Sequence, residues 1–118
     1  MAVGSLSEVV IDCHDCDSLA EFWAAVLGGT PVRESPEWVA VIMPDGSTTV
    51  SFQQVPEAKV CKNRVHLDVL VTDLEEAAAQ CVALGATQVT DRRRQADPIG
   101  DFIVLLDPEG NEFCVVLS

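Results

Sequence analysis

The spacing of hydrophobic residues predicts a strand and then a helix at the start of the chain. Residues 6–13 are typical of a strand. The apolar residues that follow recur at the i, i+3, i+4 spacing of one helix face and are Leu19, Phe22, Trp23, Val26 and Leu27. Asp17 or Ser18 is the expected N-cap, with Ser18 and Glu21 in capping-box spacing. Gly28-Gly29 should end this helix, because glycine readily adopts the backbone of a C-cap.

Three shorter strands complete the first half of the chain. They are predicted at 31–34, 38–43 and 48–54, and Pro44-Asp45-Gly46 is the expected turn between the last two.

The second half repeats this order. A strand is predicted at 64–71, followed by a helix that Asp73 caps, with Glu76 at the capping-box position. The apolar stripe of this helix is Leu74, Ala77, Ala78 and Cys81, and Gly85 ends it. Further strands are expected at 86–91, 102–106 and 112–117, with a turn at Asp107-Pro108-Glu109-Gly110.

Local sequence echoes support two copies of one βαβββ unit. Val10-Ile11-Asp12 is echoed by His66-Leu67-Asp68, and Pro44-Asp45-Gly46-Ser47 by Pro108-Glu109-Gly110-Asn111. Repeated units of this kind usually build one body. We therefore predict an α+β fold in which two pseudo-symmetric modules form a curved, cup-like mixed sheet with helices on its outer face. The whole chain, 1–118, is one expected domain, with modules at 5–56 and 63–118.

The second copy contains extra residues around 92–97, which include Arg92, Arg93 and Arg94. An insertion of mixed charge between two strands is expected to be a surface loop. A solvated connection and a flap over a pocket are both consistent with this sequence.

The net charge, the hydropathy and the cysteine count exclude several classes of function. The formal charge of −12 argues against nucleic acid and anionic membranes, which need clustered Lys and Arg. The acidity serves either solubility or the attraction of a cationic ligand. No apolar run is long enough for a membrane span, and the first residues lack a signal peptide's basic region. With an odd number of cysteines, five, we expect a cytoplasmic protein.

Strand alternation predicts which side chains face a pocket. In the strand at 64–71, Val65, Leu67, Val69 and Val71 should face the core, which leaves His66 and Asp68 opposite. Applying the same alternation elsewhere adds Asp12, Phe52, Gln54, Glu112 and Cys114 to His66 and Asp68 as candidate ligand-binding residues. The candidate set also includes Trp38 and Phe102. Trp38 and Phe102 are repeat equivalents, with a core role and a stacking role both open.

The layout resembles the vicinal oxygen chelate superfamily, which includes glyoxalase I, bleomycin-resistance proteins, fosfomycin-resistance enzymes and extradiol dioxygenases. The resemblance is carried by the turn at 107–111, the segments 64–68 and 84–87, and the helix at 19–28. It is greatest to small glyoxalase-like proteins, on the residues Phe22-Trp23 and Asn111-Glu112-Phe113.

This resemblance implies four metal-ligand positions, on the first and fourth strands of each module. The repeat places them at Val10, Val50, His66 and Cys114. Valine cannot coordinate a metal, so we expect no bound cofactor. A divalent metal with His66 as a ligand is the alternative, with Cys114 second, or with Asp12, Asp68 and Glu112 in a displaced site. The simplest role for His66 is that of a hydrogen-bonded histidine in a pocket or at an interface, and a polar ligand contact or weak general base is a further alternative.

We therefore expect the protein to bind or sequester a small organic molecule. If the acidity of the chain serves to attract this ligand, the ligand is expected to be cationic and aromatic. The rival is a metal-dependent lyase, isomerase or dioxygenase, and a regulatory dimer without a ligand is a third class. Whether the protein is an enzyme stays open. The resemblance also implies a homodimer.

Overall fold

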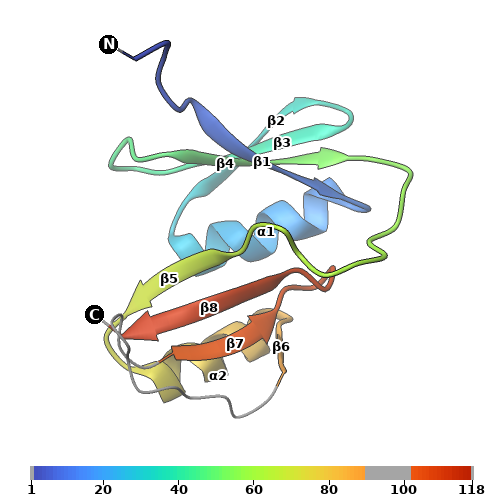
Figure 1. Ribbon diagram of the computed structural model, residues 1–118. Coiled ribbons are helices and arrows are strands. Elements are labelled where there is room, and N and C mark those ends of the chain that lie inside the picture. The colour runs from blue at the N-terminus through green and yellow to red at the C-terminus, as the bar shows by residue number, and fades with distance from the viewer. Residues whose placement is uncertain (1, 90–101, 118) are drawn as a thin grey trace. The chain divides into compact units, whose positions relative to one another are not determined.

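The computed structural model describes residues 2–89 and 102–117, so the insertion at 92–97 lies outside the described residues. The chain divides into two compact units, a first module of Met1–Ala58 and a second module of Lys59–Ser118. Each has the order β-α-β-β-β, with a four-stranded mixed sheet and one helix (Figure 1). The predicted α+β class and the repeated βαβββ module are confirmed.

In the first module, β1 and β4 lie parallel and the other neighbours are antiparallel, in the order β1-β4-β3-β2. The elements are β1 (Glu8–Cys13), α1 (Cys16–Leu27), β2 (Thr30–Ser35), β3 (Trp38–Ile42) and β4 (Thr49–Gln54).

The second module has the same connections, in the order β5-β8-β7-β6. Its elements are β5 (Leu67–Val71), α2 (Leu74–Leu84), β6 (Thr87–Gln88), β7 (Phe102–Leu106) and β8 (Glu112–Leu117). None of the described helices is long and apolar enough to cross a membrane.

The first core forms where α1 lies against β3 and β4. Leu19, Phe22 and Trp23 are buried as the apolar stripe predicted, and the two aromatic rings meet edge to face with centroids 5.3 Å apart. Val26 and Leu27, at the end of the stripe, are only half-buried.

The start of α1 differs from the prediction. Asp15 is the N-cap, and its carboxylate accepts from Ser18 N at 3.2 Å and from Ser18 Oγ at 3.0 Å. Asp17 lies in the first helical turn, where its charge suits the helix dipole, and it forms an ion pair with Arg33. An N-cap side chain accepts from the backbone amide three residues later. The Asp15 carboxylate does this at Ser18 N, so the helix begins at Cys16, before Asp17 and Ser18. In α2, the predicted cap Asp73 is confirmed, accepting from Glu76 N at 3.0 Å.

Strand β5 begins at Leu67, later than predicted. The Nδ2 amide of Asn63 donates to Val65 O at 3.0 Å, so this carbonyl bonds to a side chain. The Val65 side chain is 71% exposed and, contrary to the prediction, does not face the core. β6 is also shorter than predicted, although Val89 N still donates to Val104 O at 3.2 Å.

The turn before β8 is held by a single buried carboxylate. Asp107 is 3% exposed and its Oδ1 accepts from Glu109 N at 2.9 Å and from Asn111 N at 3.0 Å. The side-chain amide of Asn111 donates to the same carboxylate at 3.0 Å. This turn fixes where β8 begins, and therefore where Glu112 and Cys114 point.

Candidate functional site

The helix-free face of the second sheet collects most of the predicted second-module side chains. Cys114 on β8 pairs with Asp68 on β5 and with Val104 on β7, so these three side chains project to one side. Phe113 and Val115, the alternate residues of β8, are buried on the side that α2 covers. The predicted alternation of β8 is confirmed.

A pocket of about 260 Å³ opens on this face. Apolar side chains and polar groups both line it, and they are Lys62, His66, Asp68, Phe102, Val104, Glu112, Cys114 and Val116. Five of the nine predicted ligand-binding residues are therefore brought together within one module. Lys62 was missed by sequence reasoning, because it lies in the irregular segment before β5, where strand alternation gives no information.

Three of the lining residues form a compact cluster of different donor atoms. His66 Nε2 lies 3.3 Å from Asp68 Oδ1, and one donor atom each from His66, Asp68 and Cys114 lie within 4.8 Å of one another. The His66 and Asp68 side chains are 58% and 48% exposed, while Cys114 is half-buried. The cluster therefore combines two side chains that solvent reaches, His66 and Asp68, with the half-buried Cys114.

The thiol of Cys114 is held in its neutral form. Burial raises its pKa to about 11, and the neighbouring carboxylates of Asp68 and Glu112 act in the same direction. Without a bound cation, the thiol is a weak nucleophile near neutral pH.

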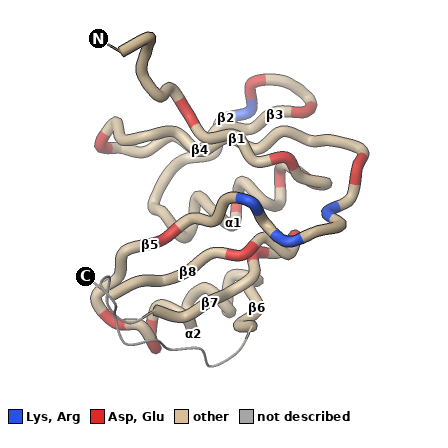
Figure 2. Tube along the Cα trace, viewed as in Figure 1, with Lys and Arg blue, Asp and Glu red and all other residues tan. Residues whose placement is uncertain are grey.

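Lys62 neutralises one of the two pocket carboxylates. Its ammonium donates to Glu112 Oε1 at 2.5 Å, and this hydrogen bond lowers the pKa of the Glu112 carboxyl. Lys62 is one of the few basic residues in a chain with many carboxylates (Figure 2). Asp68 is thus the pocket carboxylate whose charge Lys62 leaves uncompensated.

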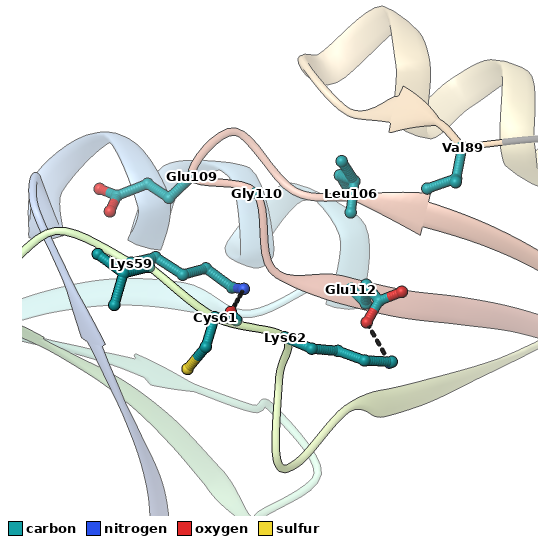
Figure 3. Close-up of a pocket in the computed structure, with 9 residues that line it drawn as sticks. Lys59, Cys61, Lys62, Val89, Leu106, Glu109, Gly110 and Glu112 are labelled. Carbon is teal, nitrogen blue, oxygen red and sulfur yellow. Dashed lines mark hydrogen bonds and ion pairs between the residues drawn. The ribbon is translucent and has the colours of Figure 1, made fainter.

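The same ion pair borders a second, wider cavity of about 530 Å³ in the second module (Figure 3). Lys62 and Glu112 line both cavities. In Figure 3, Lys59 and Cys61 lie along the irregular segment, and the Lys59 ammonium donates to Cys61 O.

The predicted placement of Phe52 and Gln54 on the helix-free face is wrong. Phe52 is fully buried and pairs with Ile11 and Val39. Gln54 Oε1 accepts from Cys16 N at 3.5 Å, which places it, and by alternation Phe52, on the side covered by α1. The error was one residue of register, which in a strand reverses the face of every side chain.

Asp12 lies on the opposite side of the first sheet, as predicted, and Trp38 lies on the same side as Asp12. Both flank Gln53 in the strand pairing, and Asp12 is exposed. Trp38 Nε1 is buried without a hydrogen-bond partner among the described residues.

Strand register also changes which residues correspond between the modules. Cys114 pairs with Asp68 and Val104, and its first-module counterpart, Ser51, pairs with Val10 and Ala40. Val10 therefore corresponds to Asp68, and the counterpart of His66 is two residues earlier, at Glu8. The expectation that Val10 and Val50 occupy these positions is wrong, because the Pro44 turn delays β4 by one residue and the motif match at Asp12 and Asp68 is out of register.

The two counterparts interact with each other. Ser51 is fully buried and its Oγ donates to Glu8 Oε1 at 2.5 Å. Sequence comparison of the repeats could have found Glu8 by aligning the helix caps Asp15 and Asp73, since the strand and the cap are separated equally in both modules.

The comparisons with known proteins agree with this fold. The chain belongs to the glyoxalase-like family, whose domain model matches residues 8–116. The resemblance to the vicinal oxygen chelate superfamily is thereby confirmed. A comparison with curated proteins gave no match.

Solved structures show the same architecture at low sequence identity. A glyoxalase/bleomycin resistance protein/dioxygenase family enzyme from Burkholderia phytofirmans PsJN matches with a TM-score of 0.80 and 20% identity, covering 97% of this chain and 98% of that one. A mutant of the fosfomycin resistance protein FosX from Listeria monocytogenes matches with a TM-score of 0.76 and 14% identity, covering 98% and 90%. That FosX structure is a complex with Mn(II) and 1S,2S-dihydroxypropylphosphonic acid.

Proposed function

We propose that the second-module pocket binds a small planar organic molecule and that the protein serves to bind or sequester it. The observation that carries this proposal is one cavity with apolar side chains and a charged rim. Phe102, Val104 and Val116 supply apolar contact, and Asp68 and His66 supply polar groups at the opening. An apolar pocket with a few convergent polar groups is the usual form of a small-molecule site.

The volume limits the ligand. Ligand pockets usually measure about 300–1,000 Å³, so a cavity of about 260 Å³ accepts a single ring or the ring-bearing end of a larger molecule. Phe102 offers the ring a stacking surface.

The charge distribution favours a cation. The Lys62 ammonium compensates Glu112, which leaves the Asp68 carboxylate to attract a positive group. An amidinium or aromatic ammonium ion could pair with Asp68 while its ring contacts Phe102. Because Asp68 is half-exposed, added salt should weaken this attraction, as the Debye length falls from about 10 Å at 0.1 M to about 3 Å at 1 M.

The test uses the only two histidines of the chain. Their ring protons are followed by NMR in the presence of chelator while aromatic amidines, neutral isosteres and aromatic carboxylates are titrated. Amidines should shift the His66 resonance and leave His14 unchanged, with an affinity that falls between 0.1 M and 1 M salt.

Matched variants identify the site. His66→Ala should weaken binding and keep the fold, whereas His14→Ala, an exposed histidine of the first module, should change neither. If His66→Ala unfolds the protein, His66 is structural. Salt-independent binding of neutral or anionic compounds would show that the acidity serves solubility, and Arg92 to Arg94 would become the better ligand contacts.

A metal-dependent lyase, isomerase or dioxygenase is the second candidate, and the cluster of His66, Asp68 and Cys114 favours it. The expectation of a metal-free protein rested on Val10 and Val50, which the register does not place at the relevant positions. Glu8, at the position that corresponds to His66, can ligate a metal. A metal bound by His66, Asp68 and Cys114 would polarise a substrate oxygen as a Lewis acid. Activity that chelator abolishes and one divalent ion restores would favour this candidate over simple binding.

A further inference from the structure

The connection between β1 and α1 contains a C-x-x-C motif that the proposed binding site does not use. Cys13 ends β1, and Cys16 is the first residue of α1 after the cap Asp15. Both side chains are thiols in the structure, and the two residues are only 4% and 0% exposed. A C-x-x-C spacing beside a helix N-terminus is a usual setting of redox-active cysteines, whereas ordinary buried cysteines are inert. Redox activity requires that the fold bring the two sulfur atoms together.

The contacts of the two thiols place them on one side of the first sheet. Cys13 pairs with Gln54 in the strand register, so both side chains lie on the side of the sheet that α1 covers. Cys13 Sγ donates to Gln53 O at 3.5 Å, and Cys16 Sγ donates to Gln54 Oε1 at 3.6 Å. Consecutive residues at the end of β4 thus accept from the two sulfur atoms, so the thiols occupy one small region of the first core.

The backbone between the cysteines also suits a disulfide. The bond requires Cα atoms about 4.4–6.8 Å apart, and a tight turn brings the Cα atoms of residues i and i+3 within about 7 Å. The chain bends at His14, between the end of β1 and the first turn of α1. Both ends of the bend are fixed, because Val55 N donates to Cys13 O at 2.9 Å and Cys16 N donates to Gln54 Oε1 at 3.5 Å. The two cysteines are therefore held in place before any bond forms.

Gln54 controls the access of a reagent to these thiols. Its Oε1 accepts from both the main-chain amide and the thiol of Cys16, although Gln54 itself is an exposed residue. Exposed side chains change rotamer on a timescale of picoseconds to nanoseconds, without unfolding of the backbone. A small reagent can therefore reach Cys16 when the Gln54 side chain turns away.

We propose that Cys13 and Cys16 form a redox-active dithiol that a low-molecular-weight disulfide oxidises. One cysteine thiolate attacks the reagent, so that a mixed disulfide forms, the S–S bond of the reagent breaks and one thiol leaves. The other cysteine then attacks the mixed disulfide, which closes the Cys13–Cys16 bond and releases the second thiol. Two electrons pass from the dithiol to the reagent, and the two cysteine protons end on the two released thiols. An excess of thiol reverses the reaction.

Peptide mapping detects this bond directly, because the tryptic peptide 1–33 contains Cys13 and Cys16 and no other cysteine. The folded full chain is incubated with 2-mercaptoethanol and 2-hydroxyethyl disulfide, and the remaining thiols are then blocked with N-ethylmaleimide in denaturant. We expect peptide 1–33 to be lighter than the reduced peptide by two hydrogen atoms and to carry no blocking group. An excess of 2-mercaptoethanol should restore the blocked, reduced form.

The folded and unfolded chains are compared at the same ratio of thiol to disulfide reagent. The ratio of oxidised to reduced peptide should be at least about tenfold higher in the folded chain than in urea, because a fold that holds two thiols together raises their effective concentration. An equal or lower ratio in the folded chain would refute the proposal. It would mean that the fold holds the cysteines apart and that they are ordinary buried residues.

Matched variants test the thiol pair and the role of Gln54. Cys13→Ser and Cys16→Ser should each stop at the mixed disulfide, while Cys61→Ser, at the exposed cysteine of the second module, should form the bond as the natural chain does. Gln54→Ala should speed oxidation about fivefold, the factor that corresponds to one hydrogen bond. Gln53→Ala, whose side chain lies on the other face beside Asp12, is the control and should not. Equal rates for the two glutamine variants would show that Gln54 does not cover Cys16.

Circular dichroism checks the folding of each variant. The comparison in urea uses the natural chain, so it decides the proposal even where a buried serine disturbs folding. The dithiol lies in the first module and the proposed ligand pocket in the second. A failure here therefore leaves the binding of amidines unaffected, and the two proposals fail separately.

Discussion

Replacing Asp107 by Ala should destabilise the turn that positions β8. The carboxylate accepts from two main-chain amides, at 2.9 and 3.0 Å, and from the Asn111 side chain at 3.0 Å. Hydrogen bonds to a charged group contribute about 1.5–3 kcal/mol each and are not additive within a network. Because water can reach the half-buried Glu109 and Asn111, we expect a total loss of about 3 kcal/mol in the free energy of unfolding.

Urea denaturation measures this loss. With a slope of about 2 kcal/mol per M, the unfolding midpoint should fall by about 1.5 M. Asp45→Ala is the matched control, because Asp45 is the aspartate of the corresponding first-module turn and accepts from one residue, Ser47, whose amide nitrogen lies at 2.9 Å, in an exposed position. A midpoint for Asp107→Ala no lower than that for Asp45→Ala would refute the assignment of Asp107 as the residue that holds its turn.

Two further substitutions test the first module. Asp15→Ala removes the N-cap of α1 and should cost about 1 kcal/mol at pH 7. The Ser18 hydrogen bonds lower the folded-state pKa of Asp15, so this stabilisation is complete above the unfolded pKa and is lost as the pH falls through the folded pKa. Urea midpoints of the natural and Asp15→Ala proteins should therefore converge in acid, and a constant difference would contradict the argument. Gly29→Ala should cost about 1–3 kcal/mol, since the added Cβ would lie 2.7 Å from Val41 Cγ1. Gly4→Ala, where nothing lies within 4 Å, should leave the thermal midpoint unchanged; equal midpoints for both glycine variants would show that the site relaxes without cost.

Much of the candidate site followed from strand periodicity. The side chains of His66, Asp68, Glu112 and Cys114 were expected on one face, and all four line the pocket. Phe102, for which a core role was also open, lines it as well. Alternation is reliable here because Phe113 and Val115 must be buried, which fixes the opposite face of β8. In β4, Val50 and Phe52 do alternate with the polar residues Thr49, Ser51 and Gln53. The wrong face was chosen because the repeat match was shifted by one residue.

The sequence by itself determined the two βαβββ modules, the helix stripes and the turns, since these depend on local periodicity and on capping residues near in the chain. The tertiary structure decided what depends on pairing between distant strands. It placed Glu8 and Ser51, not Val10 and Val50, at the positions that correspond to His66 and Cys114. It also brought Lys62 to Glu112, which leaves Asp68 as the pocket carboxylate that Lys62 does not pair with. Strand register is set by packing and turn length over many residues, and a slip of one residue changes the chemistry of an entire face.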